Sequence, residues 1–250
     1  MSGEFAAGTA DSLVGRVVLV TGAAGGLGAA AAQAAAQAGA TVILLGRKPA
    51  KLERLYDRIA AIGPEPVIYP MDLAGASAED HAVLAQQIDE QLGRLDGVLH
   101  CAADFPGLTP FEHADPAVLA RVLHVNLTAR AWLSQACLPL LRRQSDAALV
   151  FVLDDPARVG QAYWGAYGAA QHAQRGLLAS LHGETAAGPV RVSGLQPGPM
   201  RTALRARAYT HEEDRDAVEA QRYAGACVSL LGAEGAPRRG TIWQQAFAPA

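Results

Sequence analysis

Short apolar runs recur along the chain and alternate with longer segments whose apolar residues follow helical spacing. Runs of this kind, flanked by polar residues, are typical of strands buried inside a sheet. They predict strands at residues 17–20, 41–45, 67–69, 96–100, 148–153, 190–195 and 240–244. The intervening segments predict helices at residues 29–38, 49–62, 77–92, 116–143 and 163–187, the fourth of them broken near Asn126. This alternation indicates an α/β domain in which helices cover both faces of one parallel sheet of about seven strands.

A glycine-rich turn lies between the first predicted strand and the first predicted helix. It reads Thr21-Gly22-Ala23-Ala24-Gly25-Gly26-Leu27-Gly28, a Gly-x-x-x-Gly-x-Gly spacing at positions 22, 26 and 28. The backbone N–H groups of such a turn and the positive end of the helix dipole bind phosphate. Glycine is needed because a Cβ would hold a pyrophosphate away from the backbone. The strand, turn and helix therefore predict a doubly wound, Rossmann-type nucleotide-binding domain.

The residues after the second predicted strand indicate which dinucleotide binds. Rossmann-type domains place the group that contacts the adenosine ribose about 20 residues beyond the glycines. A carboxylate there would hydrogen-bond the free 2′-hydroxyl of NAD, but this chain has Arg47 and Lys48. Their charges suit a 2′-phosphate and favour NADP(H). The alternative is that both cations are merely solvated at the end of a strand.

Two further strand ends carry candidate cofactor contacts. Asp72 follows the third predicted strand, where it either accepts a hydrogen bond from the adenine amino group or caps the next helix. Cys101-Ala102-Ala103 ends the fourth predicted strand beside the expected cofactor. After the sixth strand, Pro197-Gly198-Pro199 begins a loop, because proline cannot continue the ladder.

Composition and charge restrict the class of protein. The chain has 250 residues, of which 50% are hydrophobic and 18% charged, enough for one sizeable core. Without a linker or repeat, residues 1–250 are expected to form one domain, with a loose tail at 1–14 and a helical substrate lid at about 198–222. A net charge of −3 without a basic cluster argues against a nucleic-acid partner.

The cysteines and the N-terminus favour a cytoplasmic protein. Cys101, Cys137 and Cys227 are widely spaced, so neither a disulfide framework nor a metal site is expected. The first residues lack the basic segment and apolar core of a signal peptide. No apolar stretch reaches the about 18 residues that a membrane span requires, so no membrane partner is expected.

Taken together, these motifs resemble those of the short-chain dehydrogenase/reductase family over about residues 14–245. The resemblance rests on the glycine turn together with Asp72-Leu73, Val125-Asn126-Leu127, Trp164-Gly165-Ala166-Tyr167 and Pro197-Gly198. Gly46-Arg47-Lys48 is similar to the NADP-binding segment of a bacterial YciK-like subgroup. The resemblance implies a cofactor site formed by Gly22, Ala24, Gly25, Gly26, Leu27, Gly28, Arg47, Lys48, Asp72, Leu73, Cys101, Ala102, Gln171, Pro197, Gly198 and Thr202.

The resemblance also implies an active site in which two usual residues are replaced. Tyr167 matches the general acid/base of the family, and Asn126 is retained. Four residues beyond the tyrosine, one helical turn away, the family has a lysine, and this chain has Gln171. Thirteen residues before the tyrosine the family has a serine, and this chain has Asp154. We therefore expect a degenerate catalytic tetrad of Tyr167, Asp154, Asn126 and Gln171.

Both replacements work against the tyrosine mechanism of the family, unless Asp154 is protonated. Gln171 supplies no charge to lower the pKa of Tyr167, and an ionised Asp154 raises that pKa and repels a developing alkoxide. A protonated Asp154 would instead donate a hydrogen bond to the substrate oxygen. We predict an NADP(H)-dependent oxidoreductase that reduces activated carbonyl, quinone or imine-type acceptors. The alternative is a catalytically impaired homologue that binds NADP(H) as a sensor or partner subunit. The family resemblance implies a homodimer or homotetramer.

Overall fold

The computed structural model describes residues 11–209, 217–245 and 247, and within them seven strands form one sheet. The sheet order is β3-β2-β1-β4-β5-β6-β7, and every pairing is parallel. The strands are β1 (Val17–Thr21), β2 (Thr41–Gly46), β3 (Val67–Pro70), β4 (Gly97–His100), β5 (Ala147–Val152), β6 (Val190–Pro197) and β7 (Ile242–Gln245). The predicted α/β, doubly wound fold is confirmed.

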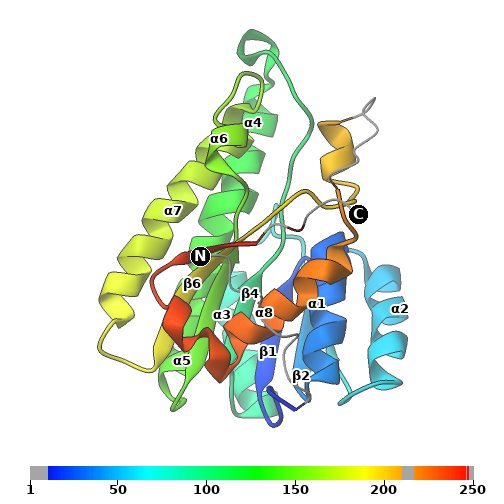
Figure 1. Cartoon of the computed structure of the whole chain (residues 1–250), viewed down its shortest axis with the longest axis vertical. Coiled ribbons are helices and arrows are strands. Elements are labelled where there is room, and N and C mark those ends of the chain that lie inside the picture. Colours follow the sequence, from blue (N-terminus) through cyan, green and yellow to red (C-terminus); the bar gives the residue numbers. More distant parts are fainter. Residues whose placement is uncertain (1–10, 210–216, 246, 248–250) are drawn as a thin grey trace.

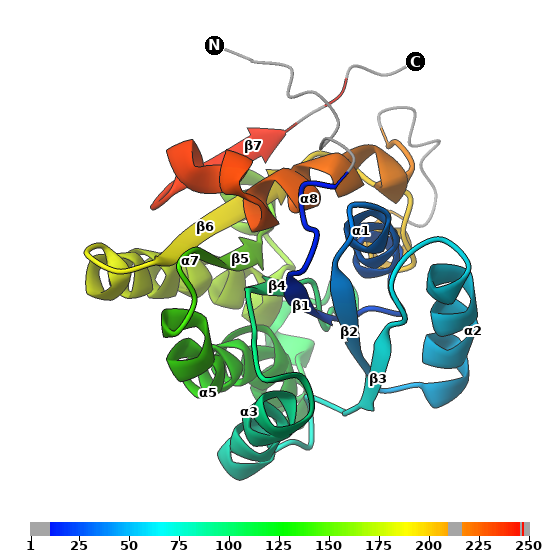
Figure 2. The ribbon, with the colours of Figure 1, turned by 90° about the horizontal axis from the view of Figure 1, so that it is seen from below.

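Helices pack against both faces of this sheet (Figures 1 and 2). One face is covered by α1 (Gly26–Gln37), α2 (Pro49–Ala60) and α8 (Ala224–Leu231). The other is covered by α3 (Ala78–Leu92), α5 (Ala129–Arg142) and α7 (Gly165–Thr185). Two shorter helices, α4 (Pro116–Leu123) and α6 (Pro156–Val159), precede α5 and α7.

The central strands are apolar throughout because both of their faces are buried. In β1, Val18 and Val20 pack in the core beneath α1, α2 and α8. Val17 and Leu19 pack in the core beneath α3, α5 and α7. Successive strand residues point to opposite sides of the sheet, so an uninterrupted apolar run serves two cores at once.

The predicted break near Asn126 is confirmed. A π-helical turn, His124–Thr128, joins α4 to α5 without an intervening loop. Such turns accommodate one extra residue within a helix and often occur at functional sites. Here the turn buries Asn126 completely.

Several expectations are corrected. The loose tail predicted at 1–14 is wrong for its described part, because Leu13 is fully buried and donates a backbone hydrogen bond of 2.8 Å to Ala38. Residues 1–10 lie outside the described residues. The segment predicted as a helical lid contains only short 3₁₀ turns, Arg205–Arg207 and Ala220–Tyr223, in its described portions, and 210–216 lie outside them. Helix α8 was not predicted.

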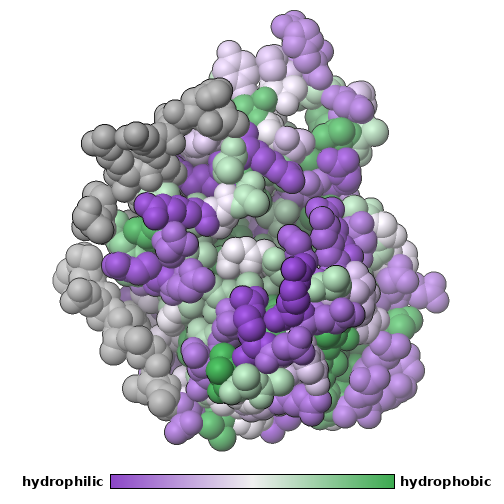
Figure 3. Space-filling model, turned by 90° about the vertical axis from the view of Figure 1, so that its right-hand side faces the viewer, coloured by the Kyte–Doolittle hydropathy of each residue, from purple (hydrophilic) through white to green (hydrophobic). Residues whose placement is uncertain are grey.

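The surface seen from the right of Figure 1 is mostly hydrophilic, with hydrophobic side chains in small separate groups (Figure 3). Among the described residues, no helix is both long and apolar enough to cross a membrane. The same residues contain no cluster of three or more histidine, cysteine or acidic side chains suited to a metal ion.

Candidate active site

A cavity of about 660 Å³ opens at the carboxyl ends of the central strands. Parallel α/β sheets usually bind ligands at this edge, where the strand order reverses about β1 and β4. Every residue predicted to contact the cofactor lines the cavity: Gly22, Ala24, Gly25, Gly26, Leu27, Gly28, Arg47, Lys48, Asp72, Leu73, Cys101, Ala102, Gln171, Pro197, Gly198 and Thr202. Tyr167 and Asp154 line the same cavity, so one continuous space joins the glycine turn to the candidate catalytic groups.

The glycine turn presents backbone to this space. Gly22 has φ +65, a left-handed conformation that favours glycine. A Cβ on Gly28 would lie 2.3 Å from the carbonyl oxygen of Gly22, which is too close for any side chain. Helix α1 begins at Gly26, and no side chain caps its N-terminus. The first N–H groups of α1 therefore lie at the cavity without a side-chain acceptor and can bind an anion there.

The candidate 2′-phosphate group contacts lie at the end of β2. Arg47 and Lys48 are exposed, and Lys48 immediately precedes α2. Within the part of the chain that the structure describes, neither cation has a carboxylate in ion-pairing range. Both charges are thus available to an anion in the cavity.

The structure overturns one of the two roles considered for Asp72, the capping of the next helix. Its Oδ1 accepts a 3.1 Å hydrogen bond from the backbone N–H of Ala74, within the turn that follows β3. Helix α3 is instead capped by Ser77, which forms a reciprocal capping box with Asp80. The prediction that Asp72 caps this helix is therefore wrong, and Asp72 remains a cavity-lining residue.

The strand β4 is tied to the glycine turn by a buried hydroxyl. Thr21 Oγ1 accepts hydrogen bonds of 3.1 Å from the backbone N–H groups of both Cys101 and Ala102. Burial raises the pKa of the Cys101 thiol to about 12, so this thiol stays protonated and is a poor nucleophile near neutral pH. Cys101 therefore shapes the wall of the cavity rather than reacting.

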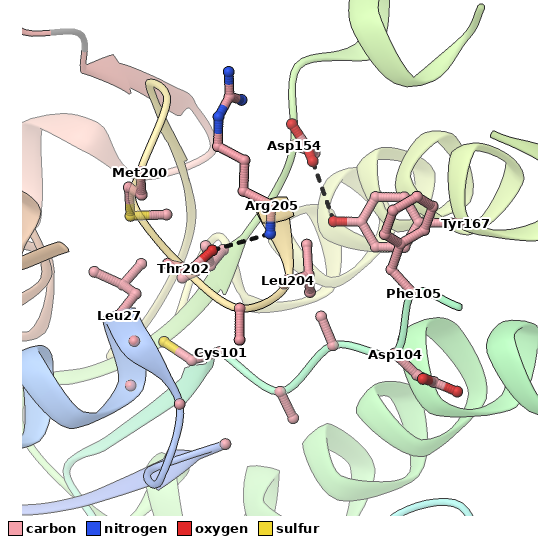
Figure 4. Close-up of a pocket in the computed structure, with 18 of the residues that line it drawn as sticks. Leu27, Cys101, Asp104, Phe105, Asp154, Tyr167, Met200, Thr202, Leu204 and Arg205 are labelled. Carbon is pink, nitrogen blue, oxygen red and sulfur yellow. Dashed lines mark hydrogen bonds between the residues drawn. The ribbon is translucent and has the colours of Figure 1, made fainter. Parts of the chain in front are cut away.

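Tyr167 and Asp154 point toward one another across the cavity (Figure 4). The Tyr167 hydroxyl donates a 3.2 Å hydrogen bond to Oδ2 of Asp154. Oδ1 of Asp154 accepts a 2.8 Å hydrogen bond from the N–H of Asp155. Gln171 is buried and its Oε1 accepts a 3.0 Å hydrogen bond from the N–H of Asp154. Asp154, Tyr167 and Gln171 thus form one connected group.

The adjacent carboxylate, Asp155, has a different task. Its Oδ1 accepts a 3.1 Å hydrogen bond from the N–H of Ala157 and caps α6. Both aspartates line the cavity, but the Tyr167 hydroxyl bonds Asp154.

Aromatic packing fixes the ring of Tyr167. The ring centroids of Phe105 and Trp164 are 5.0 Å apart and nearly parallel, and that of Phe105 lies 5.1 Å from Tyr167. All three rings are buried. The phenol therefore has little freedom except rotation of its hydroxyl hydrogen.

The surroundings keep Tyr167 protonated. Burial is the largest influence and raises the pKa of Tyr167 well above its usual range, and the neighbouring Asp154 carboxylate raises it further. The Arg130 guanidinium and a side-chain hydrogen bond with Gln171 oppose this rise without cancelling it. The phenol is accordingly a proton donor near neutral pH and not a base.

The side chain of Asn126 is bound to backbone groups. Its Nδ2 donates to the backbone oxygens of Asp104 (2.7 Å) and Val122 (2.8 Å), and its Oδ1 accepts from the N–H of Asp104 at 3.1 Å. The amide is fully used by backbone and does not line the cavity. The side chain of Asn126 therefore supports the loop after β4, and its membership of the catalytic tetrad stays a prediction.

Sequence reasoning missed Arg130, a buried cation on the cavity wall. A signal was present, because Arg130 shares a helical stripe with Ser134, Cys137 and Leu141, all buried. A charged residue in such a stripe must find polar partners inside the protein. Phe105 was missed as well, since a single aromatic residue in a loop has no distinguishing pattern.

Comparison with known proteins agrees with the cavity and the fold. The sequence profile of the short chain dehydrogenase family matches residues 16–213. The oxidoreductase YciK of Escherichia coli is 40% identical over 204 residues, which cover 81% of each chain. A short chain dehydrogenase structure from Pseudomonas syringae has 38% identity and a TM-score of 0.92, covering 97% of this chain and 99% of its own.

A further solved structure carries a cofactor. A short chain dehydrogenase from Escherichia coli CFT073, complexed with NADPH, has 37% identity and a TM-score of 0.89, covering 94% of this chain and 98% of its own. The protein therefore belongs to the short-chain dehydrogenase/reductase family, which makes it an oxidoreductase of that type.

Proposed function

We propose that this protein uses NADPH to reduce acceptors that stabilise their own anion, namely activated carbonyl, quinone or imine-type compounds. The observation that carries the proposal is a tyrosine held protonated at the end of a phosphate-binding cavity. The bound nicotinamide supplies a hydride, and the chain itself supplies binding, orientation and a proton.

The residues present fit NADP(H). The glycine-rich turn at 22–28 suits the pyrophosphate, and the exposed charges of Arg47 and Lys48 suit the 2′-phosphate. Asp72, Leu73, Cys101 and Ala102 would enclose the adenosine side, with Pro197, Gly198 and Thr202 on the opposite wall. The NADPH complex of the Escherichia coli CFT073 relative supports the same cofactor.

Tyr167 is in the protonation state that the reduction step requires. Oxidation of an alcohol needs a base to take the hydroxyl proton, whereas reduction of a carbonyl needs an acid to give one. A phenol with a raised pKa fits the second role. It is nevertheless a weak acid, so acceptors that tolerate negative charge should react and plain ketones should react poorly.

This proposal is tested by measuring NADPH consumption by the purified protein with a panel of diketones, quinones and iminium compounds. We expect NADPH consumption with some of them, little with plain ketones, and about 10²-fold less with Tyr167→Phe. No consumption across the panel, at high concentration of folded protein that binds NADPH, would contradict it.

A second candidate is a cofactor-binding protein without turnover. Two observations favour it. The Tyr167 hydroxyl is hydrogen-bonded to Asp154 instead of pointing into the open cavity, and the neutral Gln171 supplies no charge to the tyrosine. The double substitution Asp154→Ser with Gln171→Lys discriminates the two. General alcohol dehydrogenase activity in the double variant, with cofactor binding alone in the parent, would support the binding protein.

We also propose that residues about 198–222 close over the substrate. Met200, Leu204 and Tyr209 line the cavity, and Nη1 of Arg207 donates a 2.6 Å hydrogen bond to the Phe105 carbonyl on the opposite side. We expect the single domain to assemble as a homodimer or homotetramer through the α4–α5 segment and α7, which light scattering would test.

A further inference from the structure

Arg130 lies at the start of α5 with its guanidinium directed at three segments around the active site. Nη1 donates to the backbone oxygen of Val152 at 2.9 Å and to the side chain of Gln174 on α7. Nη2 donates to the backbone oxygen of Ala102 at 2.5 Å. The side chain is only 2% exposed, so β4, β5 and α7 enclose the charge at the point where each meets the cavity.

This buried charge has no anionic partner. Among the residues described, no carboxylate lies within ion-pairing range of Arg130, and its Nε has no hydrogen-bond acceptor. Its partners are two backbone carbonyls and one amide, all neutral. Burial lowers the pKa of Arg130 to about 10, which still leaves it protonated near neutral pH. Such an arrangement is costly for stability alone, because the desolvated charge is not compensated.

Tyr167 shares the cavity wall with Arg130, and Nη1 of Arg130 bonds Gln174, which lies two helical turns beyond Tyr167 on α7. The Arg130 charge accordingly acts to lower the pKa of Tyr167. Asp154 beside Tyr167 is acidic and Gln171 is neutral. Arg121, Arg158, Arg205 and Arg207 also line the cavity, but among these described arginines Arg130 is the one that is buried. Cys101 stays a protonated thiol, and burial lowers the pKa of His100 so that it stays neutral. Arg175 contacts the backbone oxygen of Asp154 and the side chain of Gln196.

We propose that Arg130 acts through Tyr167: its buried positive charge offsets part of the Asp154 charge and stabilises the oxyanion left when this phenol donates its proton. The inference rests on the proposed reductase function for its purpose, but the electrostatic effect exists whether or not a substrate is turned over. An opposite charge at short range favours the ionised phenol and stabilises an oxyanion formed beside it. Arg130 is in this sense a positioning residue.

A titration that does not require a substrate tests the effect. A fluorinated tyrosine, more acidic than tyrosine itself, is placed at position 167, and its phenolate absorbance is followed with pH. Tyr167→Phe serves as the blank. Arg130→Gln, which can keep hydrogen bonds but not the charge, should raise the apparent pKa by about one unit or more. An unchanged titration in folded Arg130→Gln would overturn the proposal.

Two variants separate charge from structure. Arg130→Lys keeps the charge and loses part of the hydrogen bonding, so its titration should stay near that of the parent. Arg142→Gln removes an exposed charge from the same helix and should change nothing. A shift of equal size in Arg130→Lys and Arg130→Gln would assign a structural role to Arg130 and overturn the proposal.

A rescue experiment gives a second, kinetic test of the same charge effect. The double variant Arg130→Gln with Gln171→Lys returns a cation to the other side of Tyr167. With a turned-over acceptor, Arg130→Gln should lower kcat about tenfold with little change in KM, and the double variant should recover it. A kcat that stays low in a folded double variant would overturn the proposal. Absence of turnover in the parent would instead count against the reductase function, and the titration would still decide the role of Arg130.

Discussion

The hydroxyl of Tyr167 donates a 3.2 Å hydrogen bond to Oδ2 of Asp154, a carboxylate half-buried at the end of β5. The bond requires a protonated phenol, and the negative charge opposes its ionisation. The carboxylate also holds the proton away from a substrate until the hydroxyl rotates. Asp154 therefore restrains Tyr167, and the reactivity of the site depends on what offsets that restraint.

Removing the charge of Asp154 should increase the reactivity of Tyr167. Asp154→Asn keeps the shape of the side chain, and the loss of like-charge repulsion should lower the pKa of Tyr167 by about one unit. Reduction of plain ketones should then rise about tenfold, as measured by NADPH consumption.

Asp155→Asn is the matched control for that substitution. It removes the same charge one residue away, at the cap of α6, and should weaken only that cap. Equal effects of the two substitutions on ketone reduction would contradict a specific Asp154–Tyr167 coupling.

The pH dependence of reduction should be flat. Because the pKa of Tyr167 is raised, its proton-donating form persists as pH increases, and kcat should not decline between roughly pH 6 and pH 10. Alcohol oxidation, which needs the ionised phenol, should be barely measurable over the same range. A kcat for reduction that falls with a midpoint near neutral pH would show that Tyr167 is not the donor described here.

Arg47 and Lys48 should determine the choice of dinucleotide. Arg47→Gln combined with Lys48→Gln should weaken NADPH binding about tenfold or more, because each charge is expected to contact the 2′-phosphate, and should leave NADH binding nearly unchanged. Arg58→Gln removes an exposed charge from α2 and serves as the control. An equal loss of affinity for NADPH and NADH would indicate that Arg47 and Lys48 do not bind the 2′-phosphate.

Gly28→Ala should disrupt the glycine turn at residues 21–28. The added Cβ would lie 2.3 Å from a backbone oxygen that cannot move without deforming the turn, a strain of about 1–3 kcal/mol. We expect a lower Tm and loss of NADPH binding by fluorescence titration. At Gly75, an added Cβ meets nothing within 4 Å, so Gly75→Ala should behave as the parent does. A Gly28→Ala protein that binds NADPH normally would contradict the claim that the backbone of the glycine turn binds the pyrophosphate.

The fold was largely predictable from the sequence because its signals are local. An apolar run such as Val17–Val20 can be buried only as a central strand of the sheet. The helices between such strands are predicted by the spacing of their apolar residues and by N-cap residues such as Asp115. The glycine spacing likewise predicts the conformation of the turn, because the left-handed backbone at Gly22 favours glycine. Helix α8 was missed because its eight residues are apolar on nearly every side and show no helical periodicity.

The active site was less predictable because its electrostatics are not local. Tyr167, Asp154 and Gln171 could be named from motifs, but the direction of the Tyr167 proton depends on geometry between β5 and α7. Asn126 could be named as well, but not the backbone groups that occupy its amide. Arg130 lies 37 residues before Tyr167 in the chain, and only the fold brings them to one cavity.

Isothermal calorimetry of the parent protein with NADPH and NADH tests the central claim most directly. A pyrophosphate on the glycine turn and a 2′-phosphate near Arg47 and Lys48 predict NADPH binding at least about tenfold tighter than NADH binding. Absence of heat on adding NADPH to folded protein, or equal affinity for the two dinucleotides, would contradict the account.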